Sequence, residues 1–264
     1  MRILRPGAEP PAFFERLRRA GTRALLLDYD GTLAPLRLDP REAVPYPGVR
    51  EILDAIMASG RTRVVLISGR WTRDLVDLVG LAQHPEIWGS HGWERLHADG
   101  RHELAPLDER ALQGLTDADT WVEEIRALGG RGEQKPASLA VHWRGLPPDQ
   151  VRRVREKVVE NWALLARESG LTLHDFDGGI ELRVPGRDKG DAVRTLASEL
   201  GDAAAMAYLG DDLTDEDAFR ALPDSGLGVL VRSELRDTHA GLWLQPPGEL
   251  LEFLSRWRDN TETR

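Results

Sequence analysis

An apolar run near the beginning of the chain ends in two acidic residues and a glycine. Residues 24–27 read Ala-Leu-Leu-Leu, and Asp28, Tyr29, Asp30 and Gly31 follow at once. A short buried run that stops at a glycine predicts a strand followed by a tight turn. Two carboxylates so close together repel each other unless a cation or a proton lies between them. The segment therefore predicts a strand of an open α/β sheet with a chemical site at its carboxyl end.

Three further segments occupy the same kind of position. Residues 68–70 (Ser-Gly-Arg) end a second apolar run, residues 189–190 (Lys-Gly) begin a predicted helix, and residues 210–215 (Gly-Asp-Asp-Leu-Thr-Asp) follow a third apolar run. Taken singly, these segments also fit a helix cap, a surface lysine and a capping loop. Taken in this order, at strand ends and helix starts, they predict one site for the transfer of a phosphoryl group.

The remaining pattern predicts a parallel-sheet core that is interrupted by a smaller unit. Apolar strands alternate with amphipathic helices in both end regions, which is typical of α/β proteins. We expect a core domain at residues 1–104 and 186–264, and an inserted domain of order αββαββ at residues 105–185, of whose four strands the pattern places three. The predicted strands are 23–28, 63–67, 86–88, 93–96, 101–104, 138–144, 171–176, 180–184, 205–209 and 226–231. The predicted helices are 13–20, 48–59, 72–79, 108–128, 149–169, 189–200 and 248–257, with a turn at 177–179 and fraying at 259–264.

The composition excludes several classes of protein. The chain has 264 residues, no cysteine and a formal net charge of -9. Disulfides and cysteine ligands are therefore excluded, and non-specific binding of nucleic acid is disfavoured. No apolar stretch reaches the roughly 18 residues of a membrane-spanning helix, and residues 1–19 lack the apolar centre of a secretory signal. We expect a monomeric cytoplasmic protein whose partner is a small molecule, with no nucleic acid and no membrane.

The acidic pair and the lysine predict a covalent mechanism. Asp28 is the expected nucleophile, since carboxylates form aspartyl-phosphate intermediates. Asp30 is the expected general acid, which protonates the leaving oxygen and later activates water, a role worth about 10²–10⁴-fold. A divalent cation and the catalytic Lys189 would balance the charge of the phosphate and of the acids. Mg²⁺ fits because it takes hard oxygen ligands, and its expected ligands are Asp28, Asp30, Asp211 and Asp212.

Small residues at two strand ends predict the phosphate contacts. Ser68 offers a hydroxyl group and, with Gly69, opens a turn whose backbone N–H groups can hold an anion at the start of the next helix. Thr32 offers a second hydroxyl group after the first strand. Asp212 and Asp215 are expected either to bind the metal or to hold its ligands in place. The phosphoryl group would thus be held by side chains and backbone from two strand ends.

The ordered set of four segments resembles the haloacid dehalogenase superfamily of aspartyl-phosphate phosphatases. The resemblance extends over residues 23–231. It implies a Rossmann-like parallel-sheet core, a bound Mg²⁺ ion and, for the type IIB subclass, an αββαββ cap domain between the second and third segments. The unit expected at residues 105–185 lies at that place in the sequence.

A narrower resemblance leads to the trehalose-6-phosphate phosphatases within that superfamily. Residues 210–219 read Gly-Asp-Asp-Leu-Thr-Asp-Glu-Asp-Ala-Phe and are similar to that family's fourth motif. Residues 89–92, 135–144 and 181–190 also agree, although Trp143 stands where the family commonly has tyrosine. The resemblance implies an enzyme of trehalose biosynthesis that hydrolyses trehalose 6-phosphate to trehalose and phosphate.

The same resemblance assigns the sugar contacts to the inserted domain. It implies that Lys135, Arg144 and Glu181 recognise the disaccharide. Chemically this is suitable, because a carboxylate accepts hydrogen bonds from vicinal hydroxyl groups and cationic side chains donate to them. We add Arg70 and His91 as expected substrate contacts. Two of these residues also fit a structural role: Arg144 as half of a surface ion pair, and His91 as a packed side chain.

Three other functions fit the same motifs. A related phosphatase would act on sucrose phosphate, mannosylglycerate phosphate or glucosylglycerol phosphate, and only the inserted domain distinguishes it. A phosphotransferase or mutase would use the same core but protect its phospho-aspartate from water. A non-catalytic sugar-phosphate sensor would bind its ligand without turnover. The presence of Asp28, Asp30, Lys189 and Asp211 together disfavours the sensor.

Overall fold

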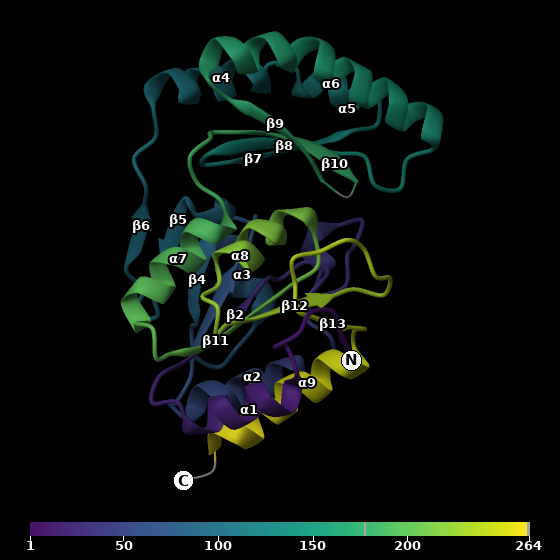
Figure 1. The fold of residues 1–264 in the computed structure, drawn as a ribbon. Coiled ribbons are helices and arrows are strands. Elements are labelled where there is room, and N and C mark those ends of the chain that lie inside the picture. The colour runs from purple at the N-terminus through teal and green to yellow at the C-terminus, as the bar shows by residue number, and fades with distance from the viewer. Residues whose placement is uncertain (177, 263–264) are drawn as a thin grey trace. The chain divides into compact units, whose positions relative to one another are not determined.

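The computed structural model describes residues 1–176 and 178–262 of the chain, and Figure 1 shows their fold. These residues form two compact units. The first combines Met1–Glu103 with the described residues from Asp188 onward, and the second is Leu104–Arg187. The second unit is therefore an insertion into the sequence of the first.

A mostly parallel sheet forms the centre of the first unit. Its strands are Arg2–Ile3 (β1), Arg23–Leu27 (β2), Arg63–Ile67 (β3), Glu86–Gly89 (β4), Glu94–Leu96 (β5), His102–Leu104 (β6), Ala205–Gly210 (β11), Leu227–Val231 (β12) and Leu242–Leu244 (β13). The strand order is β1-β13-β12-β11-β2-β3-β4-β5-β6, and the strands from β13 to β4 in that order run parallel. This confirms the predicted α/β class with a parallel-sheet core.

Helices cover both faces of this sheet (Figure 1). They are Pro10–Arg19 (α1), Val49–Ala58 (α2), Thr72–Val79 (α3), Lys189–Leu200 (α7), Glu216–Ala221 (α8) and Gly248–Glu262 (α9). α1, α2, α3 and α9 bury one apolar cluster, which includes Phe13, Leu53 and Trp257. α7 and α8 bury a second cluster, which includes Leu196 and Phe219. Both clusters contain residues of the strands, because side chains alternate between the two faces of a sheet, so the unit has three layers.

Four parallel strands end at one edge of the sheet, and a predicted site segment follows each of them. β2 leads into Asp28, β3 into Ser68, β4 into the 3₁₀ turn Ser90–Gly92, and β11 into Asp211. β2 lies between β11 and β3, and β3 lies next to β4. Neighbouring parallel strands bring their carboxyl ends to the same edge, where open α/β sheets bind ligands. The topology therefore brings the residues that follow these four strands to one edge of the sheet.

The second unit is an antiparallel sheet with helices on one face (Figure 1). Its strands are Arg131–Lys135 (β7), Ser138–His142 (β8), Thr172–Phe176 (β9) and Gly179–Arg183 (β10), and its helices are Glu109–Asp119 (α4), Val122–Ala127 (α5) and Pro148–Ser169 (α6). The strand order is β7-β8-β10-β9. Gly132 faces Val122 of α5, and its partners in register, Val141 and then Ile180, share that face. The alternate residues, many of them charged, lie on the opposite face of the sheet.

Two elements of the second unit differ from the sequence prediction. The helix expected at residues 108–128 divides into α4 and α5. The Thr120 hydroxyl donates to the carbonyl of Asp117 at 2.6 Å, a local hydrogen bond that competes with the helical pattern. β7 is also absent from the predicted strands, because residues 131–135 contain glycine and charged residues in place of an apolar alternation.

The C-terminal helix is longer than the sequence predicts. α9 continues to Glu262, so the expected fraying is wrong for residues 259–262. Thr261 is buried, and its carbonyl accepts a hydrogen bond from Arg61 at 3.3 Å, which holds the last turn. Residues 263–264 and the first residue of the predicted 177–179 turn lie outside the described part of the chain.

Candidate active site

Asp28 and Lys189 meet in the interior of the first unit. Asp28 follows β2, and Lys189 is the first residue of α7. The Lys189 Nζ donates to Asp28 Oδ1 and to Asp215 Oδ1, both at 2.7 Å, and all three side chains are buried. The Thr32 hydroxyl donates to the other oxygen of Asp28 at 3.2 Å. Donors therefore hold both oxygens of the predicted nucleophile and fix the direction of its carboxylate.

Burial and neighbouring charges set the ionisation of this cluster. Burial raises the pKa of Asp28 to about 7, with Lys189 opposing the shift and Asp215 reinforcing it. Burial and the charges of Asp28 and Asp215 raise the pKa of Asp211 well above its ordinary value. Burial also disfavours the charge of Lys189, but Asp215 and Asp28 outweigh burial and raise the pKa of Lys189. One buried lysine thus faces three acids, and the cluster favours a further positive charge.

Asp28, Asp211 and Asp215 form a buried group whose carboxylate oxygens lie within 4.8 Å of one another. Within the described residues, Asp211 Oδ1 is buried without a hydrogen-bond partner. Both carboxylate oxygens of Asp215 have hydrogen-bond donors. They accept from Lys189, from the Tyr208 hydroxyl at 2.5 Å and from the Asp211 N–H at 2.9 Å. The open oxygen of Asp211 suits a hard divalent cation, whereas the contacts of Asp215 orient its neighbours.

The backbone turn after Asp30 lies directly against this group. Gly31 has a φ of +83°, and a Cβ at this position would lie 2.0 Å from Asp211 Oδ2. Glycine is therefore required both by the left-handed backbone and by the close approach of the carboxylate. Asp212, half-buried, follows Asp211 in the loop. The carboxylates of the predicted ligands Asp30 and Asp212 lie outside the buried group, which contains Asp215 instead.

Asp30 and Arg70 pair with each other. Arg70 Nε and Nη2 donate to the two carboxylate oxygens of Asp30 at 2.5 and 2.6 Å. The same Nη2 donates to the carbonyl of Pro40 at 2.9 Å. A bidentate charged pair of this kind fixes the geometry of both side chains. The structure thus pairs the predicted general acid, Asp30, with the predicted substrate contact Arg70. Asp30 follows β2, and Arg70 follows β3.

Ser68, Gly69 and His91 lie together at the ends of β3 and β4. The His91 N–H donates to the carbonyl of Ser68 at 3.0 Å, and the Ser68 hydroxyl accepts from the Arg70 N–H at 3.1 Å. A Cβ on Gly69 would lie 2.6 Å from the His91 ring, which explains why position 69 has no side chain. His91 has a left-handed φ of +56°, a strained conformation that its surroundings maintain.

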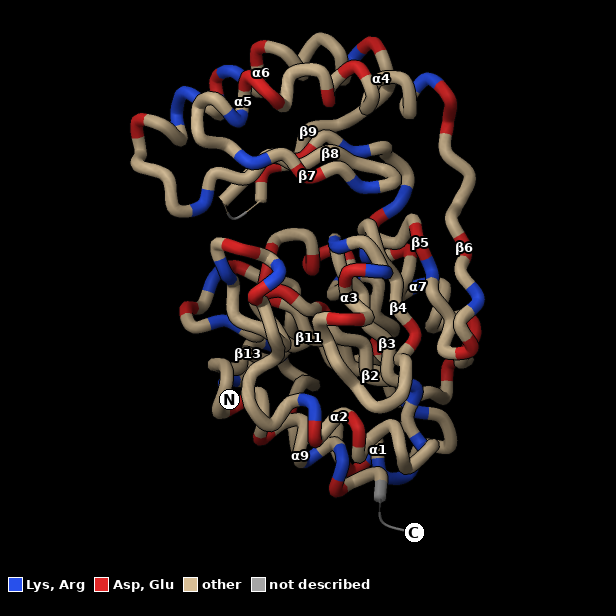
Figure 2. Tube along the Cα trace, turned by 180° about the vertical axis from the view of Figure 1, so that it is seen from behind, with Lys and Arg blue, Asp and Glu red and all other residues tan. Residues whose placement is uncertain are grey.

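The second unit carries two of its predicted residues, Lys135 and Glu181, on the charged face of its sheet, and Figure 2 shows both acidic and basic residues along β7. Glu181 is buried and accepts hydrogen bonds from Lys135 Nζ at 2.9 Å and from Arg183 Nε at 2.7 Å. Arg144 follows β8, and its side chain lies beside Gly178. Lys135 and Glu181 are therefore in direct contact, and Arg144 lies near one end of the sheet.

Glu133 and His142 form a second pair on the same face, and Glu133 is not among the predicted site residues. The His142 Nε2 lies 2.6 Å from the Glu133 carboxylate. Burial opposes the ionisation of Glu133, but Lys135 and His142 together lower its pKa to about 2. The available signal is the charge at every second residue of 131–135, which marks one face of a strand.

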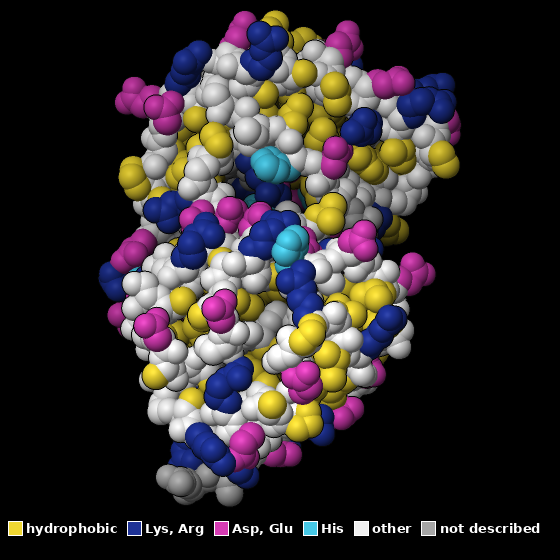
Figure 3. Space-filling model, viewed as in Figure 1, with side chains coloured by type: hydrophobic (Ala, Val, Ile, Leu, Met, Phe, Trp, Pro, Cys, Tyr) yellow, Lys and Arg dark blue, Asp and Glu magenta, His cyan; other side chains and the backbone are white. Residues whose placement is uncertain are grey.

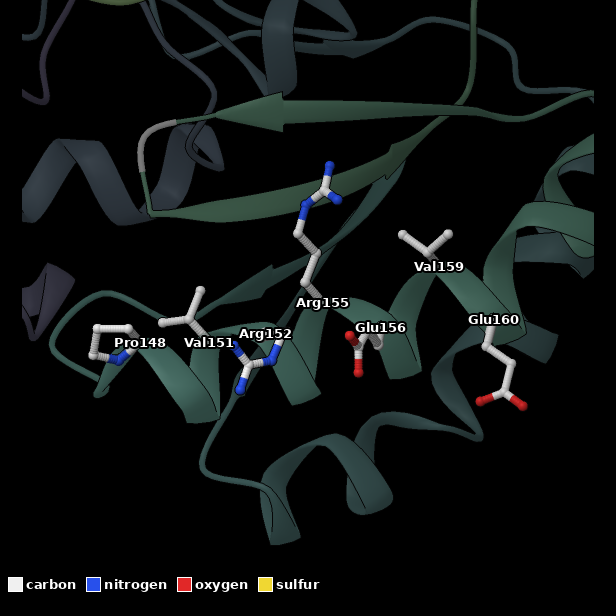
Figure 4. A pocket seen from close by; sticks show the side chains of 7 residues that line it. All are labelled: Pro148, Val151, Arg152, Arg155, Glu156, Val159 and Glu160. Carbon is white, nitrogen blue, oxygen red and sulfur yellow. The ribbon is translucent and has the colours of Figure 1, made fainter.

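A groove in the described residues lies on α6 (Figure 4). It has a volume of about 560 Å³ and is lined by seven side chains, among them Val151, Arg155 and Val159. These side chains come from successive turns of one helix, and none of them is a predicted site residue. A groove of about 370 Å³ between α4 and α6 also contains none of them. The chemical cluster therefore has to be recognised from its hydrogen bonds and charges.

The surface mixes charged and apolar side chains. In Figure 3 side chains of both charge signs surround the exposed apolar ones. Leu38, Leu164 and Leu213 are the most exposed large apolar residues, and they come from three different parts of the fold. Among the described residues, no helix combines the length and the apolar content needed to cross a bilayer.

A family model described as trehalose-phosphatase matches residues 26–241 of the chain. The match contains Asp28, Lys189 and Asp211 and the whole second unit. The chain belongs to the trehalose-phosphatase family. This finding confirms the family resemblance read from the sequence.

Individual relatives agree with this membership. The chain is 32% identical to a trehalose-phosphate phosphatase of Mycobacterium marinum, over 91% of this chain and 62% of that protein. It is also 32% identical to an uncharacterized glycosyl hydrolase of Mycobacterium tuberculosis, over 92% of this chain but 19% of that protein. The chain thus spans less than two thirds of the length of either relative. Its fold is similar to the C-terminal domain of C. albicans trehalose-6-phosphate phosphatase, with a TM-score of 0.78 over 98% of this chain and 99% of that domain, at 24% identity.

Proposed function

We propose that this chain is a phosphatase of trehalose biosynthesis that hydrolyses trehalose 6-phosphate to trehalose and phosphate. The observation that carries the proposal is the buried cluster in which Lys189 holds Asp28 beside the open oxygen of Asp211. A carboxylate nucleophile, a fixed cation and acids for a metal ion are the parts that phosphoryl transfer requires. Family membership and the name of the M. marinum relative support the choice of substrate.

The buried acids fit a divalent cation, which we assign as Mg²⁺. Asp28 and Asp211 would hold it, and the unpartnered Oδ1 of Asp211 among the described residues supports this assignment. Oxygen ligands of this kind are those that Mg²⁺ prefers. Asp30 and Asp212 stay predicted ligands, since their carboxylates lie outside the buried group. When bound, the ion would neutralise the carboxylates and the phosphate and polarise the phosphoryl oxygens.

Two displacements at phosphorus would complete the reaction. An oxygen of Asp28 forms a bond to phosphorus while the bond from phosphorus to the sugar oxygen breaks. Once its ion pair with Arg70 has opened, Asp30 takes up a proton from solvent and gives it to that leaving oxygen. Asp30 then takes a proton from the water molecule that attacks phospho-Asp28, which releases phosphate and restores both acids. Lys189 keeps its charge throughout and balances the anionic groups.

The phosphoryl oxygens and the sugar need contacts of their own. We assign the phosphoryl oxygens to Thr32 and to the turn at Ser68 and Gly69, whose N–H groups lie at the start of a helix. Arg70 and His91 adjoin that turn and are the proposed substrate contacts of the first unit.

We assign residues 105–185, which lie within the second unit, as the cap domain of a core made of residues 1–104 and 186–264. The charged face of its sheet presents Glu181 and Lys135, and Arg144 follows β8 at one end of the sheet, which makes a set of acceptors and donors suited to vicinal sugar hydroxyl groups. Glu133 on the same face joins this set. The cytoplasmic location and the monomeric state stay predictions from the sequence.

Phosphate release from a panel of sugar phosphates tests the proposed function. We expect release from trehalose 6-phosphate that requires Mg²⁺ and stops when a chelator removes it. Faster release from sucrose, mannosylglycerate or glucosylglycerol phosphate would reassign the substrate. Binding without any release would indicate a sensor, and transfer to a second sugar would indicate a phosphotransferase or mutase.

Replacing Glu181 by alanine tests the role of the second unit. The carboxylate gathers Lys135 and Arg183, and its loss removes an acceptor for sugar hydroxyl groups. We expect kcat/KM for trehalose 6-phosphate to fall roughly 10–100-fold, the value of one or two charged hydrogen bonds, and kcat/KM for a small aryl phosphate to change little. Asp175→Ala is the matched control, because Asp175 pairs in register with Ile180 on the helix-covered face. Equal losses on both substrates would show that Glu181 has no part in sugar recognition.

A further inference from the structure

An arginine from the segment between β12 and β13 holds the loop that carries Asp211 and Asp212. Arg236 Nη2 donates to the carbonyl of Asp212 at 2.6 Å and to that of Asp211 at 3.3 Å. Arg236 Nε and Arg232 Nη1 both donate to the Asp211 carbonyl as well, at 3.4 Å. A guanidinium presents its donors in one rigid plane, so it fixes the backbone between the carbonyls that it binds.

Glu216 holds this guanidinium in place. Its Oε1 accepts hydrogen bonds from Arg236 Nη1 and, at 2.8 Å, from the Thr238 hydroxyl. Its Oε2 accepts from the N–H of His239 at 2.7 Å. The side chains of Glu216 and Arg236 are only 9% and 18% exposed. The pair is therefore shielded from solvent, unlike a surface ion pair, whose two side chains move freely.

Electrostatic repulsion between acidic side chains acts on the loop that Arg236 holds. The Asp211 carboxylate lies among the buried charges of Asp28 and Asp215, and like charges at such distances repel. A mobile backbone would let the Asp211 side chain turn toward water and away from the other acids. Arg236 binds carbonyl oxygens and leaves the Asp211 carboxylate open, so it fixes the direction of that carboxylate without occupying it.

We propose that Arg236, anchored by Glu216, is a positioning residue that keeps the Asp211–Asp212 loop in the conformation that receives the divalent cation. The inference rests on the metal site assigned under the proposed function. Neither side chain touches the reacting atoms, since Arg236 acts through backbone carbonyls and Glu216 acts through Arg236. Loss of such outer contacts typically weakens metal binding roughly 10–100-fold.

Binding of Mn²⁺ to the full-length, metal-free protein tests the proposal, with the electron paramagnetic resonance signal of free Mn²⁺ as the readout. We expect Arg236→Gln to weaken binding roughly 10–100-fold. Arg236→Lys should weaken it less, because one ammonium group can still donate to a carbonyl. Glu216→Gln should weaken it in the same direction. At saturating metal, KM for trehalose 6-phosphate should stay near the wild-type value in all three variants.

Arg95→Gln is the matched control. The Arg95 side chain is 13% exposed and pairs with Glu86 at 2.9 Å and with Glu199 at 2.7 Å. Those partners lie on β4 and at the far end of α7, away from the Asp211–Asp212 loop. Loss of a partly buried ion pair should lower the melting temperature of this variant, but its affinity for Mn²⁺ should stay unchanged.

Failure of this inference is distinguishable from failure of the proposed function. A wild-type protein that binds no Mn²⁺ would overturn the metal site and the inference together. A wild type that binds Mn²⁺, with folded Arg236 and Glu216 variants that bind it equally well, would overturn only the positioning role. An equal loss of affinity in Arg95→Gln would overturn it too. Should Arg236→Gln fail to fold, Arg236→Lys and Glu216→Gln decide by the same criterion.

Discussion

Replacing Asp28 by asparagine should abolish turnover and leave the first unit folded. The amide oxygen can still accept a hydrogen bond from Lys189, but the amide cannot attack phosphorus. We expect kcat to fall roughly 10⁶-fold, the scale of losing a covalent nucleophile. Folding raises the pKa of Asp28 to about 7, so the metal-free wild type loses stability as the pH rises through the weakly acidic range toward 7. The variant lacks this loss, and its relative stability should increase over the same range.

Three measurements on the same preparations check this expectation. Phosphate release reports turnover, calorimetry reports binding of trehalose 6-phosphate, and thermal melting at several pH values reports stability. Asp99→Asn, in the exposed turn between β5 and β6, is the control and should behave as the wild type. Turnover near the wild-type rate in Asp28→Asn would show that another group attacks phosphorus.

Replacing Lys189 by methionine should impair both stability and turnover. Methionine occupies a similar volume but leaves Asp28 and Asp215, each bound to Lys189 at 2.7 Å, without a cation. Removing one partner of a buried ion pair costs about 3–5 kcal/mol. Losing one preorganised charged donor in an active site lowers kcat roughly 10²–10³-fold. The stability deficit should grow as the pH rises, because the remaining carboxyl groups must then ionise without the lysine.

A double variant separates the two effects. Lys189→Met with Asp215→Asn removes the cation together with one of its two carboxylates, so part of the lost stability should return. Turnover should not return, since Asp28 still lacks the cation that fixes its Oδ1. Thermal melting and kcat, measured on both variants, provide the comparison. If turnover recovered together with stability in the double variant, Lys189 would have only a structural role.

The buried cluster could be predicted because each member stands next to a strong local signal. Asp28 and Asp211 each follow an apolar strand directly, and Lys189 begins an amphipathic helix. Strands that belong to one parallel sheet end at the same edge, so recognising the strands also predicts that these residues meet. The α/β class follows from the same alternation of strands and helices.

Contacts between distant segments could not be predicted in this way. The pairing of Arg70 with Asp30 depends on the exact direction of two long side chains. Arg236 stands in a polar segment whose local pattern gives no indication of its contact with Asp212, 24 residues earlier. Glu133 could not be predicted as a site residue, because β7 lacks the apolar residues on which strand prediction relies.

Trapping the phosphorylated enzyme tests the central claim most directly. Sodium borohydride reduces an acyl phosphate on aspartate to the alcohol, which leaves homoserine in the chain. The protein would be quenched with borohydride during turnover of trehalose 6-phosphate, digested and analysed by mass spectrometry. We expect homoserine at position 28 only when substrate and Mg²⁺ are present. Rapid turnover with Asp28 unmodified, or homoserine at another acid such as Asp30, would contradict it.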